Sequence, residues 1–446
     1  MQNPDRVIEN AIEQNDWAAL ASRLKGLPAP EIVDVLDGLS PAQYAAFCRR
    51  LPPEQFAEIF AHLDRDKQNA LSDELTDTEL TLLVTNLRPD DRTRFLENLP
   101  QQSADKLLDL LSGEEFAKTR QLLAYPKESV GRLMTPEFFA VHADWSIEQA
   151  LRHIRIEGRK SETLSIIYVT TDDGKLIDAL ELERFVLADP GDRVSGIMDQ
   201  SFVALSPHDD REQAVRQIQK YDLHALPVVG ADNTLLGIVT ADDVMDIAEE
   251  ETTEDIQKGA AVDPLETSYH DSSIWSLYRK RAPWLVTLVF VNLAASSVIA
   301  IYEDVLASAL ALTFFIPLLM GAGGNTGSQS ATLIVRALAT GDLERSRWLS
   351  TMAKELIVGM TLGLTLGFAV GWLGVFRADF ALGMTVALAM IAIVLVANLL
   401  GVLFPLLLTK LRFDPAVASS PMVTSTADVT SLLLYFSIAN FILASQ

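Results

Sequence analysis

The sequence has a single cysteine, Cys48, and none of its six histidines lies after His270. One cysteine excludes an internal disulfide framework, so Cys48 is predicted to be a buried thiol. The absence of histidine from residues 283–446 argues against serine or metal catalysis there, because both usually recruit an imidazole. The polar start, Met1–Asn10, lacks an apolar signal core, and we expect the N-terminus to stay in the cytosol.

Positive charge is also scarce, with 36 Lys and Arg against 60 Asp and Glu. Residues 283–446 contain seven basic and eight acidic residues, so the first 282 residues have 29 and 52, and a net charge of −23. This acidity argues against nucleic acid or anionic lipid as a partner of the first part, since both bind Lys and Arg. It favours either solubility or cations as ligands.

Five long apolar runs occupy the second part of the chain. Each reaches the ~20 residues that a helix needs to cross a bilayer. They are 283–301, 305–335, 356–376, 380–409 and 415–446. The sequence therefore predicts a five-helix α transmembrane domain over 279–446, with lipid around it.

The basic residues that flank these runs predict an orientation. They gather before the first run, between the second and third, and between the fourth and fifth, whereas the opposite side has only Arg377. Basic loops stay on the cytosolic side of a membrane. We therefore expect a multi-pass protein of the cytoplasmic (inner) membrane, with cytosolic N-terminal domains and an extracytoplasmic C-terminus.

The second apolar run is long for one upright helix. It contains Pro317 and four glycines between Gly321 and Gly327, next to Asn325. Gly and Pro in a span often mark a broken helix, whose freed backbone groups face protein or water. We predict a functional break here; close helix packing through small residues is the alternative.

Asp428 is the only charged residue in the last run. A carboxylate at that depth costs ~2.5–3.5 kcal/mol on insertion scales, so such residues usually serve a function. In a helix, Ser420, Thr424 and Asp428 fall at i, i+4 and i+8 and form one polar stripe. Small hydroxyls that lead to a carboxylate predict the wall of a cation pathway. An Asp buried against a partner in the bundle, or one near an interface, is the alternative.

Leucines spaced by 12 residues, from Leu27 to Leu111, open the polar part, and Pro or a capping residue often follows them. This spacing predicts an all-α helical-repeat domain over 1–128, a small solenoid. Residues 129–247 then show two copies of a strand–helix–strand order, an α/β pair. The second copy, 224–229 and 237–243, resembles a CBS (cystathionine-β-synthase) motif, a family that often binds adenosine nucleotides. Thr240 and Asp243 match its ribose and phosphate contacts, and a purely structural pair is the alternative.

Residues 241–255 contain eight acidic side chains and no basic one. Such a run is usually a solvated face. A divalent cation shared with a second acidic surface would relieve its repulsion, because hard cations bind carboxylate oxygens. The candidate ligands are Asp243, Asp246, Glu251, Glu254 and Asp255 in this helix-like stretch, with Asp210, Glu212 and Asp222 before it.

The order of helical repeat, CBS pair, acidic linker helix (248–278) and five spans resembles the MgtE family of magnesium channels and transporters over essentially the whole chain. The most specific pieces are residues 317–329 and the Asp428-Val-Thr430 motif. The resemblance implies a homodimer with a pore between spans two and five, where the Asp of that motif binds hydrated Mg²⁺. The implied pore residues are Asp428, Thr424, Ser420 and Asn325, although Ser420 stands where relatives often have Asn.

The resemblance also implies that the acidic linker, called the plug helix in that family, closes the pore when it binds Mg²⁺ together with the CBS acids. Mg²⁺ is then both cargo and regulator, and ATP is a candidate ligand of the CBS pair. We expect no enzyme, because the spans have no second deep carboxylate for aspartyl chemistry. A membrane-tethered Mg²⁺ or nucleotide sensor without transport is the rival interpretation.

Overall fold

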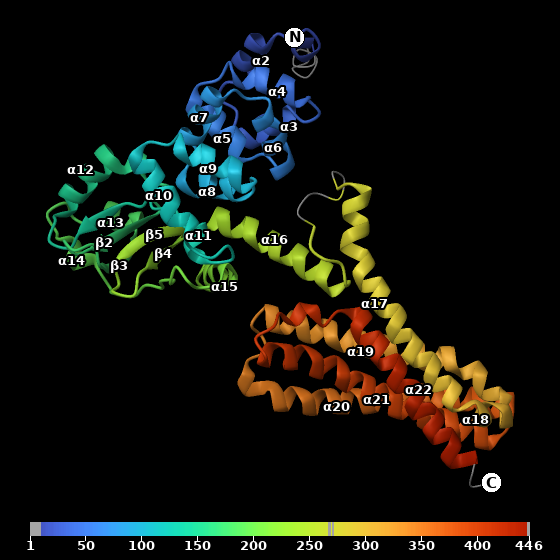
Figure 1. Ribbon diagram of the computed structural model, residues 1–446. Helices are drawn as coiled ribbons and strands as arrows, with labels where there is room; N and C mark the ends of the chain where they lie inside the picture. The colour runs from blue at the N-terminus through green and yellow to red at the C-terminus, as the bar shows by residue number, and fades with distance from the viewer. Residues whose placement is uncertain (1–9, 266–268, 270–271, 444–446) are drawn as a thin grey trace, which may run out of the picture. The chain divides into compact units, whose positions relative to one another are not determined.

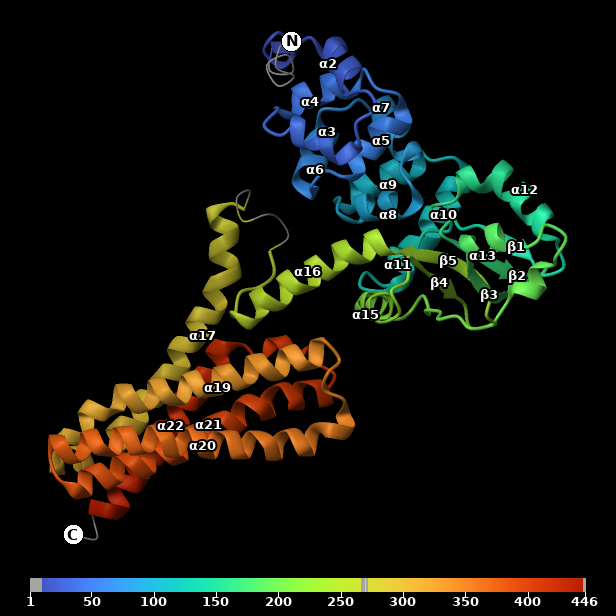
Figure 2. The same ribbon diagram turned by 180° about the vertical axis from the view of Figure 1, so that it is seen from behind.

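The protein is described by a computed structural model, which places residues 10–265, 269 and 272–443. The polar start, for which we predict a cytosolic location, therefore lies outside the described residues except for Asn10, and the last three residues lie outside them as well. The chain forms two compact units, Met1–Glu249 and Glu250–Gln446. Figures 1 and 2 show helical repeats and an α/β part in the first unit and long helices in the second.

Short helices form the start of the first unit, as the 12-residue repeat predicts. From Leu27 to Leu111, each repeat leucine lies two residues before the first residue of a helix. Alternate helices pack on one another, for example α5 on α3 and α7, which gives a continuous apolar core that buries Cys48. The helices are α2 (Trp17–Leu24), α3 (Ala29–Val35), α4 (Pro41–Cys48), α5 (Pro53–Ala61), α6 (Arg65–Asp73), α7 (Asp77–Asn86), α8 (Pro89–Glu97), α9 (Gln101–Asp109) and α10 (Gly113–Leu123).

Two α/β halves complete the first unit. Parallel pairing of β1 with β2 and antiparallel pairing of β2 with β3 form one sheet, and the antiparallel strands β4 and β5 form the other. The elements are α11 (Val130–Leu133), β1 (Ala140–His142), α12 (Ile147–Glu157), η1 (Gly158–Lys160), β2 (Ile166–Thr170), β3 (Leu176–Glu181), α13 (Leu182–Leu187), α14 (Val194–Ile197), α15 (Arg211–Tyr221), β4 (Ala225–Val229) and β5 (Leu235–Thr240). The predicted α/β pair is confirmed, but the strand–helix–strand order holds only for the first half (β1, α12, β2). The second half is helix–strand–strand (α15, β4, β5), with an isolated bridge at Leu205 in place of the first strand.

The acidic stretch forms one helix, α16 (Ala241–Gly259), which begins directly after β5. Val244 and Ile247 anchor its first turns in the first unit, where both side chains are buried. Its second half belongs to the second unit. The helix-like stretch predicted over 241–255 is thus a helix, and it follows β5 without a loop.

Among the described residues of the second unit, five helices are long and apolar enough to cross a membrane, which confirms the predicted number. The first, α17, begins at Ile274 and continues through Pro283, so it starts earlier than the predicted span. The elements are α17 (Ile274–Ile301), α18 (Glu303–Ser308), η2 (Leu310–Phe315), α19 (Ile316–Ala339), η3 (Arg345–Arg347), α20 (Trp348–Arg377), α21 (Phe380–Lys410), η4 (Pro415–Val417) and α22 (Ser420–Leu443).

The predicted break at the glycine run of the second span is wrong. The helix α19 runs without interruption from Ile316 to Ala339, and the irregular segment lies before it, at Ala309–Phe315. Three of the four glycines are instead needed for close packing, since a Cβ at Gly323, Gly324 or Gly327 would lie 3.0 Å or less from a neighbouring side chain or carbonyl. The alternative, packing through small residues, describes this run.

A row of glycines also joins α20 to α21. Gly359, Gly363, Gly367 and Gly371 recur every fourth residue on α20, and a Cβ at each would lie 2.7–3.2 Å from an atom of α21. The two backbones therefore approach closely along most of their length. In the most apolar stretch of α21, 50% of the residues are buried by the rest of the structure, whereas the same share is 28% in α20. The helix α21 therefore lies at the centre of the helix packing.

Candidate functional site

The polar stripe of α22 lies against α19. A Cβ built on Gly324 would be 2.7 Å from Thr424 Cγ2 and 3.7 Å from Asp428 Oδ1. Thr424 and Asp428 are therefore on the same side of α22, as their spacing predicts, and glycine allows α19 to approach them. Figure 1 shows α19 and α22 adjacent within the red and orange helices.

The remaining predicted pore residues flank this contact. Ser420 is the first residue of α22, one turn before Thr424, and is half-buried. Asn325 follows Gly324 directly on α19, and its side chain is exposed in the single chain. The four residues thus belong to the facing helices α19 and α22, which agrees with a path between these two helices.

Asp428 is half-buried. Among the residues that the structure describes, no basic side chain pairs with its carboxylate and no donor forms a hydrogen bond to it. The neighbouring hydroxyls of Thr426 and Thr430 donate instead to carbonyl oxygens one turn earlier. Intramembrane carboxylates usually pair with another group or face a water-filled cavity. Asp428 has no such pair in the described part of the chain.

A second group of carboxylates lies where α16 meets the helical repeats, inside the first unit. Asp242 and Asp243, at the start of α16, approach Asp90 and Asp91, at the start of α8. Burial raises the pKa of Asp90 well above its usual range, and the nearby Asp243 raises it further. Burial likewise raises the pKa of Asp243 to about 7, although a 2.7 Å hydrogen bond from Thr240 Oγ1 opposes the shift.

These shifts describe carboxylates that are costly to ionise together. Asp90 is 8% exposed, and its Oδ1 atom has no hydrogen-bond partner in the described part of the chain. Basic residues offset part of this cost, since Arg88, Arg94 and His62 oppose the rise that burial causes in the pKa of Asp91. Arg94 Nη1 also lies 3.2 Å from Asp246 Oδ2, and both of these side chains are exposed. A cation that reached this cluster would replace repulsion by attraction.

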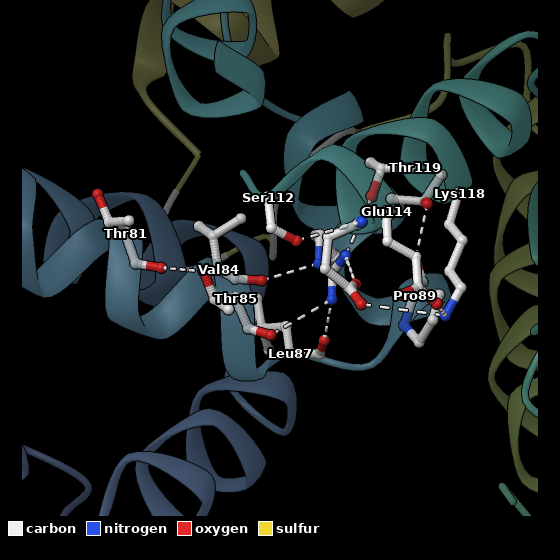
Figure 3. Close-up of polar contacts among 12 residues, drawn as sticks. Thr81, Val84, Thr85, Leu87, Pro89, Ser112, Glu114, Lys118 and Thr119 are labelled. Carbon is white, nitrogen blue, oxygen red and sulfur yellow. Dashed lines mark hydrogen bonds and ion pairs between the residues drawn. The ribbon is translucent and has the colours of Figure 1, made fainter. Parts of the chain in front are cut away.

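A buried arginine fixes the helix that presents Asp90 and Asp91. Arg92 is 2% exposed, and its guanidinium donates to the carbonyls of Val84 (2.8 Å) and Leu87 (2.7 Å) and pairs with Glu115. Figure 3 shows Val84, Thr85 and Leu87 from the end of α7 on one side and Thr119 of α10 on the other. Since α8 is thereby fixed between α7 and α10, its two aspartates are held at a set position.

The other predicted regulatory acids are dispersed. Asp210 caps the start of α15 by accepting from the Glu212 amide, Glu212 pairs with Arg216, and Asp222 ends the same helix with a left-handed φ of 52°. The two ends of an 11-residue helix are ~15 Å apart, so one ion cannot bind both. Glu251, Glu254 and Asp255 lie in the second half of α16, where Glu254 pairs with Lys258.

Among the described residues, no three Asp, Glu, His or Cys side chains converge on a ready-made metal site. This does not conflict with Mg²⁺ as a ligand, because Mg²⁺ usually retains several waters and takes only one or two carboxylates. Asp90 and Asp91 were not predicted from the sequence. Their only local signal is the pair of acids after Pro89, which also fits an ordinary helix start.

A helical-repeat domain, an α/β pair and an acidic helix precede five membrane helices, and the last of these has a carboxylate without a partner among the described residues. Together they define a multi-pass membrane protein of transporter type. The MgtE family, described as divalent cation transporters, matches residues 316–438. The MgtE intracellular N domain matches residues 27–128, and CBS domains match 130–188 and 194–250.

Individual relatives agree over the full length. The chain is 36% identical over 439 residues to the magnesium transporter MgtE of Thermus thermophilus, which covers 98% of both chains. It is 28% identical over 418 residues to the magnesium transporter MgtE of Bacillus subtilis, with 91% and 92% covered. A solved cytosolic domain of the Mg²⁺ channel MgtE in complex with ATP is 30% identical, with a TM-score of 0.52 over 55% of this chain and 99% of that one. The chain belongs to the MgtE family.

Proposed function

We propose that two copies of this chain form a pore that carries Mg²⁺ across the cytoplasmic membrane. Membership in a family of magnesium transporters supports the cargo. The observation that carries the proposal is the Asp428 carboxylate, which lies on a membrane helix without a partner in the described chain, one turn from Thr424 and beside Gly324. Asp428 is the proposed ligand of the hydrated ion, and Thr424, Ser420 and Asn325 contact its water shell.

The chemistry of the ion supports this arrangement. Mg²⁺ loses water reluctantly, and carboxylates that reach it through its hydration shell attract it without a dedicated cage. Conduction also requires binding that is weak enough to release the ion. One carboxylate per chain among small hydroxyls meets both conditions better than a cluster of acids would.

Two copies are proposed because a lone carboxylate that faced lipid would be costly. A twofold axis beside α19 and α22 would place two Asp428 side chains around one path and remove them from lipid. Mass measurement or cross-linking in mild detergent tests this, and a protein that is monomeric under all mild conditions would contradict it. By the same proposal, the N-terminal unit is cytosolic and the C-terminus is outside.

We also propose that cytosolic Mg²⁺ closes the pore. The first 282 residues have a net charge of −23, and the half-buried Asp91 and Asp243 lie near the buried Asp90 where the start of α16 meets α8. Mg²⁺ that binds the compact arrangement more tightly than the open one shifts the population towards it by that difference in affinity. Asp246, Glu251, Glu254 and Asp255 on α16, with Asp210, Glu212 and Asp222 on and beside α15, are the further proposed ligands.

The test of the function is a flux measurement with purified protein in liposomes. Mg²⁺ uptake that exceeds empty liposomes, and that falls when Mg²⁺ is raised on the side of the N-terminal unit, is the expected result. No uptake under any condition would favour the alternative, a membrane-tethered Mg²⁺ or nucleotide sensor. Uptake that internal Mg²⁺ does not inhibit would support the proposed pore and contradict the proposed gate.

ATP is the second proposed ligand, at the CBS pair. The solved relative in complex with ATP supports it, as do Thr240 and Asp243, which are joined by the 2.7 Å hydrogen bond. Asp243 would then contact the nucleotide and also belong to the acidic cluster that is proposed to bind Mg²⁺. Binding of labelled ATP to the full chain, compared with Thr240→Val, tests it; equal binding by both would exclude Thr240 from the site.

A further inference from the structure

The C-terminal end of α16 has one basic residue in an otherwise acidic helix. Lys258 is the only Lys, Arg or His in the helix. Its ammonium group pairs with Glu254, one turn earlier, and with Asp414 Oδ2 at 2.6 Å, and its side chain is 26% exposed. Burial alone would lower the pKa of Lys258, but the hydrogen bonds to Asp414 and Glu254 outweigh it and raise the pKa. The lysine is therefore a firmly charged, partly buried group.

Asp414 belongs to the segment that leads into α22. Its other oxygen, Oδ1, accepts a 2.8 Å hydrogen bond from the Ala416 amide and thereby caps the short helix η4. This turn passes directly into Ser420, the first residue of α22, so the two oxygens of one carboxylate connect the turn to α16. Lys258 thus contacts the chain segment that positions the helix of Asp428.

Two further bonds attach the same end of α16 within the second unit. Gln257 Oε1 accepts from the Leu265 amide at 2.7 Å, and the Asp263 amide donates to the Lys280 carbonyl of α17 at 3.1 Å. None of these bonds needs a metal. Lys258 attaches the end of the helix to the Asp414 turn, and Asp263 attaches the segment after the helix to α17, whereas Asp242 and Asp243 of its first turn lie near α8.

We propose that Lys258 is the positioning residue that transmits the state of α16 to the pore, by holding the end of this helix against the Asp414 turn at the start of α22. This inference rests on the proposed gate. Mg²⁺ acts at the acidic residues, and the lysine pair converts the position of α16 into a position of α22. Of the proposed Mg²⁺ ligands, the lysine contacts only Glu254, so a weaker pair with Asp414 leaves the other ligands unchanged but reduces their effect on conduction.

The test compares Lys258→Gln, Lys258→Arg and Asp414→Asn in the full-length protein in liposomes. The measured quantity is the internal Mg²⁺ concentration that halves the flux. We expect about a tenfold increase for Lys258→Gln and for Asp414→Asn, because a hydrogen bond between charged groups is lost. Asn still caps Ala416, and Lys258→Arg should remain close to wild type. Flux without internal Mg²⁺ should change less than twofold.

A matched control and a double variant make the result specific. Lys410→Gln removes an exposed lysine from the end of α21 and should leave the half-inhibition concentration unchanged. The double variant Lys258→Gln/Asp414→Asn should shift no further than either single one, since both remove the same pair. Additive shifts, or a shift equal to that of Lys410→Gln, would overturn the role of the pair.

The outcomes distinguish a failure of the role of Lys258 from a failure of the proposed gating by Mg²⁺. If wild-type flux does not respond to internal Mg²⁺, the proposed gate fails and the role of Lys258 fails with it. If the wild type is inhibited and Lys258→Gln is inhibited equally, only the role of Lys258 fails. Should Lys258→Gln not assemble in the membrane, Asp414→Asn and Lys258→Arg still decide, because one removes the charge pair and the other keeps it.

Discussion

The carboxylates at the start of α16 and the carboxylate of α22 are buried in opposite ways. At α16, the buried Asp90 and the half-buried Asp91 and Asp243 lie close together, and burial and neighbouring carboxylates raise their pKa values. One oxygen of Asp90 has no partner in the described chain. In α22, Asp428 stands alone among small residues. Crowded carboxylates gain much from a cation and change position when it binds, whereas a single one gains little and releases the ion quickly. The first arrangement suits a switch and the second a path.

The largest effect is expected at the isolated carboxylate. Asp428→Asn keeps the shape of the side chain and loses the charge that offsets Mg²⁺, so uptake should fall about 100-fold or more, the factor that ~3 kcal/mol represents. Asp428→Ala should be at least as damaging. Flux in liposomes measures this, with membrane assembly checked by gel filtration. Asp379→Asn, which can still cap the Leu382 amide outside the stripe, is the control. Uptake by Asp428→Asn at the wild-type rate would show that Asp428 is structural.

A smaller effect is expected at the crowded carboxylates, because several of them act together. Neutralising Asp243, Asp246, Glu251 and Asp255 removes both ligands and repulsion. We expect the loss of ligands to dominate, so that conduction persists at an internal Mg²⁺ concentration about tenfold above the one that inhibits wild type. Patch recording measures this.

The opposite outcome of that experiment is also informative. If the loss of repulsion dominates, the variant closes without Mg²⁺. The cluster would then keep the pore open by charge repulsion rather than bind Mg²⁺ as a set of ligands. A matched control is Glu58→Gln with Asp73→Asn, Asp105→Asn and Asp109→Asn, which makes the same charge change on exposed residues of the helical repeats. Unchanged inhibition in both sets would mean that the acids of α16 are only a solvated face.

The close approach of α19 to Asp428 is tested by two glycines. A Cβ at Gly324 would lie 2.7 Å from Thr424 Cγ2, whereas a Cβ at Gly321 would meet no atom within 4 Å of the described chain. Overpacking costs typically ~1–3 kcal/mol, so Gly324→Ala should lower the thermal unfolding temperature, while Gly321→Ala should not. Thermal unfolding in detergent measures both. Equal stability of the two variants would contradict the packing of α19 against Thr424.

The smallest effect is expected at Arg94, whose exposed pair with Asp246 joins α8 to α16. Such pairs contribute ~0.2–1 kcal/mol, a factor of up to ~5. Arg94→Gln should therefore make α16 more sensitive to protease in a chelator, and Mg²⁺ should restore protection, because it supplies the missing positive charge. Arg152→Gln, in another exposed pair, is the control. Sensitivity that Mg²⁺ does not reverse would indicate a purely structural role for Arg94.

Local periodicity made much of the fold predictable from the sequence. The 12-residue leucine spacing locates the start of each helix from α3 to α10, and the apolar runs locate the five long helices. The glycine run of α19 misled the prediction, because a local pattern does not distinguish a broken helix from a tightly packed one. The difference lies in Thr424, Ile393 and Ala397, which come from two other helices.

The site was predictable only in part, for the same reason. The stripe from Ser420 to Asp428 follows from helical spacing within one segment. The approach of Asp90 and Asp91 to Asp243 does not, because it joins residues about 150 positions apart through the buried anchor of Arg92. A contact of this kind depends on how the helical repeats pack on the α/β part, which no local pattern encodes.

The glycine row between α20 and α21 has a consequence for how the protein is made. These two helices follow one another in the chain and fit closely along the glycines, and Asn398 Nδ2 of α21 donates hydrogen bonds to Glu355 of α20, so they can leave the translocon as a finished hairpin. The helix α22 emerges last and carries the only carboxylate of its span, which lipid does not tolerate well. Its insertion therefore depends on helices already in place, and the order of synthesis provides α19 and α21 before α22 requires them.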